Sequence, residues 1–472
     1  MGQRASRIRH TVVVGALTCA LAISGGIGSS ARADAAPPLA DGYGNILAGA
    51  VTAGNVSTHL RALQRIANAN GGNRALGTPG YLRSVEYVEN ALRGAGFTPV
   101  RQEFTATLFE VKSQELRVDG AAVTSEVLGY SGASAQFTAP VSQVAAGDAD
   151  SGCQLGDFPA STRGSVVVVD RGVCPFSQKA DNAKRAGARA VIVVNNESGA
   201  LQGTLGEDAD DPLPVLAVEQ AMGAKVRSAA TASVGVDAKT SRVKTWNVLA
   251  ETLAGAPNSV LMVGAHLDGV PEGPGINDNG SGASAVLQTA ITMTAFAPVK
   301  NKVRYAFWGA EEQGLIGSTH YVESLTDAGR SAISRYLNFD MIGSHNGGYF
   351  VYDGDGSAKL PGAYAGPAGS GEIEKVLFAH LSAKGLRPEV SGFDGRSDYD
   401  AFASAGIASG GVDSGADAKK TPAQAAKWGG VAGEIFDQNY HTARDTFANV
   451  NQKVLGNLAP AVAYAAGYFS MV

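Results

Sequence analysis

Cysteine is scarce in this sequence, with three residues in 472, and charged residues make up only 17% of it. Two of the cysteines, Cys153 and Cys174, follow residue 33, and neither lies beside a histidine at the spacing of a zinc finger. In an exported chain, an isolated pair of this kind is more typical of a disulfide than of a metal site. The same part of the chain has no dense cluster of lysine and arginine, which argues against a nucleic-acid partner.

Long hydrophobic runs are also missing after residue 33, where no segment has the length and apolarity of a membrane span. The apolar run at 11–23 follows three arginines and precedes the small-residue sequence ARA at 31–33. This order is typical of a secretory signal peptide that is cleaved before Asp34. We therefore expect a secreted product without membrane attachment, and cleavage would change the formal net charge from −5 to −9.

The length of the chain predicts two domains or one large decorated domain, because one ordinary core does not accommodate 472 residues. We expect the first part of the larger domain over residues 34–119. It should comprise a loose lead-in at 34–48, two helices at 55–72 and 77–97, and short strands near 99–118.

The character of the sequence changes between residues 120 and 243, which contain both remaining cysteines and no histidine. The runs GSVVVVDRG and RAVIVVNN predict buried strands, and SQKADNAKRAGA between them predicts an amphipathic helix. We interpret residues 120–243 as a separate, inserted domain.

Residues 244–472 alternate between apolar strands and helices. Strands are predicted at 259–266, 302–312 and 335–343, and helices at 281–296, 314–325, 371–385 and after Asn451, with Ser281 as the cap of the first helix. This alternation predicts an α/β fold with a mixed, largely parallel sheet that is covered by helices on both faces.

Several side chains that bind metals lie where the predicted strands end, at the edge where open α/β sheets bind ligands. A glycine-rich loop after the first strand returns an aspartate to the same edge, and a segment near the C-terminus adds a histidine. The six candidates are His266, Asp278, Glu311, Glu312, Asp340 and His441.

Mixed histidine and carboxylate ligands suit zinc, which takes about three protein ligands in a catalytic site. A carboxylate has two oxygens, so Asp278 can be shared, and five ligands with one shared form two such sets. One of the adjacent residues Glu311 and Glu312 then remains free to face water, and their spacing does not decide which. Two metals in such a site favour hydrolysis.

At these residues the sequence resembles family 28 of the metallopeptidases, including secreted leucine-type aminopeptidases of actinomycetes and yeast aminopeptidase Y. The resemblance covers about residues 50–118 and 245–450. It rests on the motifs GAHLDGV, GINDNGSG, WGAEEQGLIGS, YLNFDMIG, DGRSDY and NYHT. Residues 120–243 resemble the protease-associated (PA) domain of many such enzymes, which implies a Cys153–Cys174 disulfide.

The resemblance implies a role for each site residue. It assigns His266 and Asp340 to one zinc ion, Glu312 and His441 to a second, and Asp278 as the bridge between them. It makes Glu311 the general acid/base. It further implies that Tyr440 stabilises the oxyanion and that Arg396 contacts the substrate beyond the scissile bond. From the apolar and glycine character of the quoted motifs, we expect a large hydrophobic first side chain to lie against Met341 and Gly395. The substrates would be the N-termini of peptides or proteins, and the Asp278–Asn279 peptide would be cis.

The sequence departs from this family pattern in two places. Asn439 and Arg444 stand where actinomycete relatives have cysteines, so that local disulfide is not expected. Gly456 and Pro460 stand where those relatives have acidic calcium ligands, so no calcium site is expected.

Two other functions remain open from the sequence. A carboxypeptidase or dipeptidase of the same fold would need a cationic pocket for a free carboxylate, and Arg396 alone does not decide this. A receptor-like homologue without catalysis is disfavoured, because all six candidate residues are present.

Overall fold

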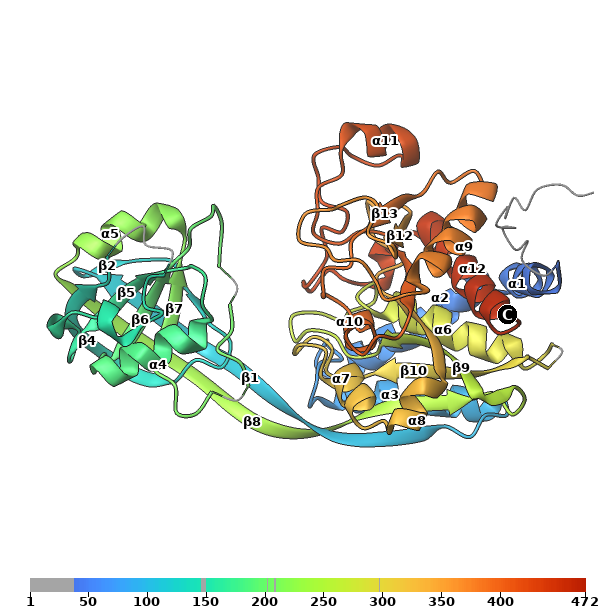
Figure 1. The fold of residues 1–472 in the computed structure, drawn as a ribbon, viewed down its shortest axis with the longest axis horizontal. Coiled ribbons are helices and arrows are strands. Elements are labelled where there is room, and N and C mark those ends of the chain that lie inside the picture. The colour runs from blue at the N-terminus through green and yellow to red at the C-terminus, as the bar shows by residue number, and fades with distance from the viewer. Residues whose placement is uncertain (1–37, 146–149, 202, 208, 297) are drawn as a thin grey trace, which may run out of the picture. The chain divides into compact units, whose positions relative to one another are not determined.

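The computed structural model describes residues 38–145, 150–201, 203–207, 209–296 and 298–472 (Figure 1). The predicted signal peptide lies outside this part of the chain. Among the residues that are described, no helix combines the length and the apolar character that crossing a membrane requires.

The centre of the larger sheet is parallel. Its strands follow the order β13, β12, β14, β11, β9, β10, β8, and β1 pairs with β8. They are β1 (Val100–Val118), β8 (Thr231–Glu251), β9 (Ala256–His266), β10 (Asn301–Trp308), β11 (Ile333–Phe339), β12 (Phe350–Tyr352), β13 (Glu389–Ser391) and β14 (Ser409–Asp413). β9 is parallel to β10 and β11, and β11 is parallel to β14, whereas β8 and β12 join this centre in antiparallel pairings. The predicted mixed, largely parallel sheet is confirmed.

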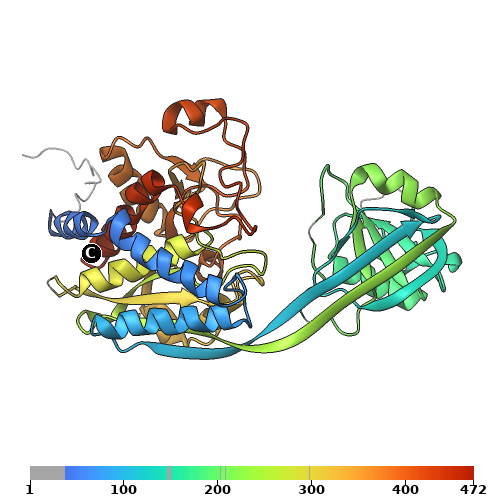
Figure 2. The same cartoon turned by 180° about the vertical axis from the view of Figure 1, so that it is seen from behind.

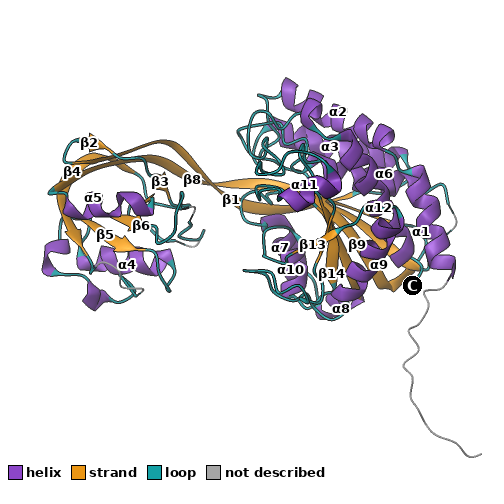
Figure 3. Ribbon diagram, turned by 90° about the horizontal axis from the view of Figure 1, so that it is seen from above, coloured by secondary structure: helices purple, strands orange, loops and turns teal. Residues whose placement is uncertain are grey.

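Helices cover both faces of this sheet (Figure 3). One face carries α1 (Pro38–Ala50), α2 (Ala53–Ala69), α3 (Pro79–Gly94), α6 (Gly280–Met293), α9 (Ser370–Ala383) and α12 (Gln452–Phe469), and the other carries α7 (Ile316–Glu323), α8 (Asp327–Ala332) and α10 (Tyr399–Ser404). Along β9, Leu261 and Val263 pack into the core under the first set, while Val260 and Met262 pack into the core under the second. Alternate residues are thus buried on opposite faces, which explains why this strand is a continuous apolar run.

α1 corrects the prediction of a loose lead-in over residues 34–48, because Pro38–Ala50 forms a helix. Tyr43 and Leu47 are buried in the core that also contains α12. A Cβ added at Gly44 would lie 2.9 Å from the ring of Tyr464 on α12, so the glycine permits the two helices to approach closely. The alanine, proline and glycine content suggested a loop because the sequence does not reveal this partner helix.

β1 corrects the prediction of short strands near 99–118, because it is one strand of 19 residues. It pairs antiparallel with β8 from Val100 opposite Leu249 to Val118 opposite Ala232, with one register shift after Val111 (Figure 2). Exposed residues in the middle of β1 interrupt its apolar alternation. The pairing with β8 nevertheless gives one side of β1 an almost continuous ladder of backbone hydrogen bonds, so the strand continues.

In the smaller region, β4 (Ser134–Gln143), β5 (Val166–Asp170), β6 (Ala190–Val194) and β7 (Val215–Val218) are successively parallel, and β4 also pairs antiparallel with β8. β3 (Glu126–Val127) pairs with β7, β2 (Ala121–Ala122) pairs with β1, and the helices are α4 (Phe176–Ala186) and α5 (Gly223–Ser228). Along β5, Val166 and Val168 face one apolar core, and Val167 and Val169 face another. A disulfide joins Cys153 to Cys174, as the resemblance implied.

Candidate metal centre

Three neighbouring parallel strands deliver candidate ligands to one edge of the sheet. β9 ends at His266, which is paired with Trp308 at the end of β10, and Glu311 and Glu312 follow shortly after. β11 lies on the other side of β9 and is followed directly by Asp340. Because the carboxyl ends of parallel strands meet at one edge, these side chains converge there although they are up to 74 residues apart in sequence.

The loop between β9 and α6 contributes Asp278, and its peptide bond to Asn279 is cis, as the resemblance implied. The side chain of Asn279 accepts a hydrogen bond from the backbone N–H of Gly282 at 2.9 Å and caps α6. The prediction that Ser281 is the cap was wrong. Ser281 lies inside the helix, where its hydroxyl donates to the carbonyl of Asn277 at 2.7 Å.

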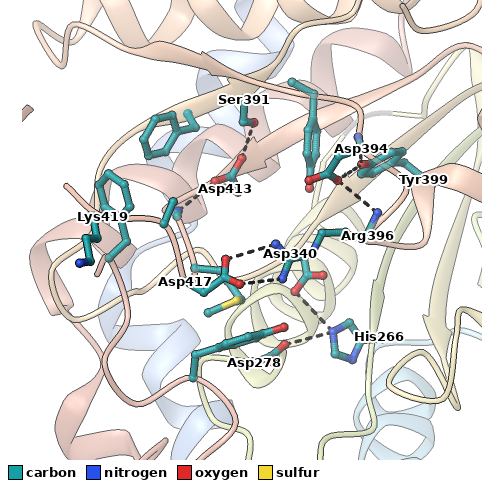
Figure 4. A pocket seen from close by; sticks show the side chains of 18 of the residues that line it. His266, Asp278, Asp340, Ser391, Asp394, Arg396, Tyr399, Asp413, Asp417 and Lys419 are labelled. Carbon is teal, nitrogen blue, oxygen red and sulfur yellow. Dashed lines mark hydrogen bonds and ion pairs between the residues drawn. The ribbon is translucent and has the colours of Figure 1, made fainter. Parts of the chain in front are cut away.

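Asp278 lies between the two candidate histidines, with one carboxylate oxygen directed to each. Its Oδ1 is 3.3 Å from Nε2 of His266, and its Oδ2 is 3.1 Å from Nε2 of His441. Nε2 of His266 is also 3.4 Å from Oδ1 of Asp340, while Nε2 of His441 is 3.0 Å from Oε2 of Glu312. The structure therefore brings five of the six candidates into two groups that share Asp278; His266 and Asp340 of the first are labelled beside Asp278 in Figure 4.

The adjacent glutamates face different histidines. Oε2 of Glu311 lies 3.8 Å from Nε2 of His266, whereas Glu312 contacts His441. Their backbone N–H groups donate to the two oxygens of Asp268 at 3.2 and 3.3 Å, and this fixes the turn from which both side chains leave. Burial raises the pKa of Glu311 well above its usual value, with His266 opposing the shift and Glu312 adding to it.

The donor set fits divalent cations. Asp340 Oδ1 and Glu312 Oε1 are buried and have no hydrogen-bond partner among the described residues, although buried polar atoms are normally satisfied. Burial, together with the charge of Asp278, raises the pKa of Glu312 to about 7. Burial lowers the pKa of His441, but its hydrogen bonds to Asp278 and Glu312 raise it overall to about 10. Both shifts report an excess of negative charge that cations would relieve.

Side chains that the sequence analysis missed hold the ligands in place. The buried guanidinium of Arg74 donates to the carbonyls of Leu267, Pro274 and Gly275, and so ties both ends of the metal-binding loop to a distant segment. Asp445 accepts from the backbone N–H groups of Asn277 and Asp278 at 2.7 and 2.9 Å.

Two further groups orient ligands directly. The hydroxyl of Ser397 donates to Oδ2 of Asp340 at 2.6 Å. Asp268 lies 3.7 Å from Nδ1 of His266, where a carboxylate can orient a ligating imidazole. Asp268 and Ser397 stand inside the quoted motifs HLDG and GRSD, so the motifs themselves could have indicated them.

Three of the four remaining predicted residues line a cavity of about 380 Å³ that opens onto the candidate ligands. Tyr440 lines it, and its ring stacks on His441 with the centroids 3.8 Å apart. Arg396 also lines it and forms an ion pair with Asp417 at 3.1 Å. Met341 is part of the lining, whereas Gly395 is not one of the lining residues.

Comparison with known proteins agrees with this geometry. The model of Peptidase family M28 matches residues 247–466, and that of the PA domain matches residues 137–226. The probable lipoprotein aminopeptidase LpqL of Mycobacterium tuberculosis is 46% identical over 442 residues, which cover 92% of this chain and 88% of the relative. The chain belongs to peptidase family M28. It is an aminopeptidase of this family with a PA domain, as the motifs predicted.

Further relatives of this M28 aminopeptidase support the assignment. Leucine aminopeptidase 2 of Trichophyton rubrum is 39% identical over 399 residues, which cover 83% of this chain and 79% of that protein. The solved aminopeptidase of Aneurinibacillus sp. strain AM-1 matches with a TM-score of 0.72 and 25% identity, over 89% of this chain and 95% of that one. The likeness extends over nearly the whole of each chain, so it includes both regions described above.

Proposed function

We propose that this aminopeptidase binds two zinc ions and removes single residues from the free N-termini of peptides and proteins. The observation that carries the proposal is the orientation of Asp278, whose two oxygens face His266 and His441 respectively. His266 and Asp340 would hold one ion, Glu312 and His441 the other, and Asp278 both. Two ions held by these residues would polarise the scissile carbonyl and lower the pKa of a bound water toward neutrality.

Glu311 is the acid/base in this proposal, as the family resemblance implies, and Glu312 is then the ligand. The carboxylate of Glu311 lies beside His266 and Asp340, where it would take a proton from the attacking water and give it to the leaving amine. The phenol of Tyr440 donates a hydrogen bond to the oxygen that becomes negatively charged in the transition state. Its place beside His441 in the cavity lining supports this role.

The free N-terminus is recognised by charge. The carboxylates of Glu311 and Asp340 receive the substrate ammonium, and a blocked N-terminus would leave them buried without a partner, at a cost of about 1–3 kcal/mol or more. Arg396 contacts the substrate beyond the scissile bond. The first side chain of the substrate lies against Met341 and the buried aromatic rings of Phe350 and Phe436, which favours large hydrophobic residues.

A carboxypeptidase or dipeptidase is the alternative, and it would need an available cation for a free carboxylate. Arg396 is already paired with Asp417. Acidic side chains also outnumber Arg396 and Lys419 in the lining of the cavity. Both observations favour an ammonium as the charged end of the substrate. A receptor-like homologue without catalysis is disfavoured by the complete set of ligands and by Glu311.

We also propose that the enzyme is exported, on the evidence of the arginines, apolar run and small-residue site at its N-terminus. The proposed organisation is a signal peptide at 1–33, a peptidase domain formed by 34–119 and 244–472, and an inserted PA domain at 120–243. The latter boundary falls within β8, so the two regions share that strand.

The decisive test is a panel of initial rates on leucine anilide, its N-acetyl form and a substrate with a free C-terminal residue, each with and without a strong chelator. We expect rapid cleavage of leucine anilide alone, abolished by the chelator and restored by zinc. Equal rates on the free and the acetylated substrate would overturn the aminopeptidase mechanism, and activity that persists without metal would overturn the zinc site.

A further inference from the structure

The wall of the cavity beside the metal centre combines apolar and charged side chains. Part of this wall is apolar and buried, formed by Met341, Phe350, Tyr352 and Phe436. One carboxylate, Asp413, stands among these side chains. It lies outside every motif that predicted the site, and no role has been assigned to it above.

The sheet register explains the position of Asp413. Phe339, the last residue of β11, pairs in parallel with Val412, so the residues that follow them, Asp340 and Asp413, leave the same edge on neighbouring strands. On its other side, Asp413 is paired with Phe350 of β12. The carboxylate is thus flanked by a candidate metal ligand on one strand and an aromatic wall on the other.

Two hydrogen bonds hold the carboxylate of Asp413, but no cationic side chain of the described residues neutralises its charge. Its Oδ2 accepts from the hydroxyl of Ser391 at 2.6 Å and its Oδ1 accepts from the backbone N–H of Gly415 at 2.9 Å (Figure 4). A carboxylate has about four acceptor positions, so about two remain available. Within the described parts of the chain, no lysine, arginine or histidine forms an ion pair with it.

The other charged side chains that line the cavity do not neutralise Asp413. Arg396 is paired with Asp417, and Asp394 accepts from the hydroxyl of Tyr399 at 2.8 Å. Lys419 is exposed, and its ammonium points away from Asp413 in Figure 4. Burial raises the pKa of Asp413 to about 6, so its carboxyl is ionised at neutral pH.

We propose that Asp413 selects lysine and arginine as the first residue of the substrate. The methylene groups of these side chains lie along the apolar wall, as a leucine or methionine side chain does, and their cationic end reaches the open side of the carboxylate. The inference rests on the proposed aminopeptidase function and adds a charged specificity to its apolar one. Aspartate and glutamate are excluded as first residues by repulsion from Asp413.

A different role for Asp413 makes a different prediction. If this carboxylate received the N-terminal ammonium, which every substrate carries, its removal would slow all substrates by the same factor. If it receives the side-chain cation, only lysine and arginine substrates lose a contact. The ratio of kcat/KM between lysine and leucine substrates therefore separates the two roles.

The experiment compares wild type, Asp413→Asn and Asp413→Leu on lysine, arginine, norleucine and leucine anilides. We expect the lysine-to-leucine ratio of kcat/KM to fall about 10- to 100-fold in both variants, the range for a hydrogen bond to a charged group. The matched control is Asp400→Asn, which removes a nearby carboxylate that accepts from Tyr364 and does not line the cavity. This control should keep the wild-type ratio.

The wild type alone gives a second measurement, which does not depend on the folding of a variant. Norleucine has the chain length of lysine without the ammonium, so the wild type should cleave the lysine anilide at least about tenfold more efficiently. A norleucine rate equal to or above the lysine rate, or an unchanged lysine-to-leucine ratio in folded Asp413→Asn, would refute the role of Asp413. Either result with active leucine cleavage leaves the aminopeptidase function standing, whereas inactivity on every anilide refutes that function instead.

Discussion

The molecule contains two sets of parallel strands that are equally apolar but end differently. β9 ends in His266, β10 is followed by Glu311 and Glu312, and β11 is followed by Asp340. These side chains converge around Asp278, with two carboxylate oxygens unpaired. In the smaller region, β5 ends in Asp170, which forms an ion pair with Arg227, and β6 is followed by Asn195, whose side chain donates to the carbonyl of Gly199. Both sets of strands bring polar side chains to one edge. Of the two edges, only that of β9, β10 and β11 has charged side chains that are available to a ligand.

The comparison predicts that metal removal affects the two regions unequally, and this is the largest effect we expect. A strong chelator should abolish peptidase activity and zinc should restore it, because cations balance the carboxylates of the larger sheet. Elemental analysis should find two zinc ions per active chain. One zinc ion at full activity would contradict the shared role of Asp278.

Glu311→Gln should separate catalysis from metal binding. Removing a general acid/base lowers turnover by about 10²–10⁴-fold. Zinc content and the thermal unfolding midpoint should stay near those of the wild type, because Glu311 is outside both proposed ligand sets. The matched variant is Glu312→Gln, which should lose zinc. Loss of zinc in the first variant and retention in the second would reverse the assignment of the pair.

Cys153→Ser with Cys174→Ser should disturb the smaller region alone. The disulfide joins residues 21 positions apart, and a crosslink over a loop of this size contributes about 2–4 kcal/mol of stability. We expect earlier unfolding or proteolysis of residues within 120–243, with little change in kcat on leucine anilide. A parallel loss of kcat would show that the two regions are coupled in catalysis.

Asp119→Asn should give the smallest effect, and one that depends on pH. The backbone N–H groups of Thr231 and Ala230 donate to this exposed carboxylate at 2.9 and 3.0 Å, and they lower the pKa of Asp119. Because the folded-state pKa is below the unfolded one, the stabilisation is complete above the unfolded value of about 3.9 and disappears as pH falls through the folded value. The melting temperatures of variant and wild type should therefore differ near neutral pH and converge in acid. Asp237→Asn, at an exposed position on β8, is the control and should show no such convergence.

Much of the larger sheet was predictable because its strands are buried on both faces and its helices are amphipathic. The ligand-type residues were predictable for a related reason, since each follows the end of an apolar strand. The family resemblance alone assigned Glu311 as the general acid/base and Glu312 as a metal ligand, because spacing in the sequence does not distinguish two adjacent glutamates.

The features that the sequence did not predict depend on contacts with residues that are distant along the chain. α1 is a helix because α12 lies beside Gly44, and β1 is continuous because β8 accompanies it. Asp413 was missed because its surroundings are set by the register between β11 and β14, which no local pattern encodes.

The buried charge of Arg74 bears on whether the chain folds before or after it binds metal. Its permanent positive charge is buried near Asp268, Asp278 and Glu312, where burial lowers the pKa of Arg74 and these carboxylates oppose that shift. A cluster of carboxylates with no cation of its own would repel itself until metal arrived. With the guanidinium built in and bonded to the loop carbonyls, we expect the chain to fold before it binds the proposed zinc ions, unlike small zinc domains that remain unfolded without their metal. Folding and metal loading would then be separate steps, and activity would begin only with the second.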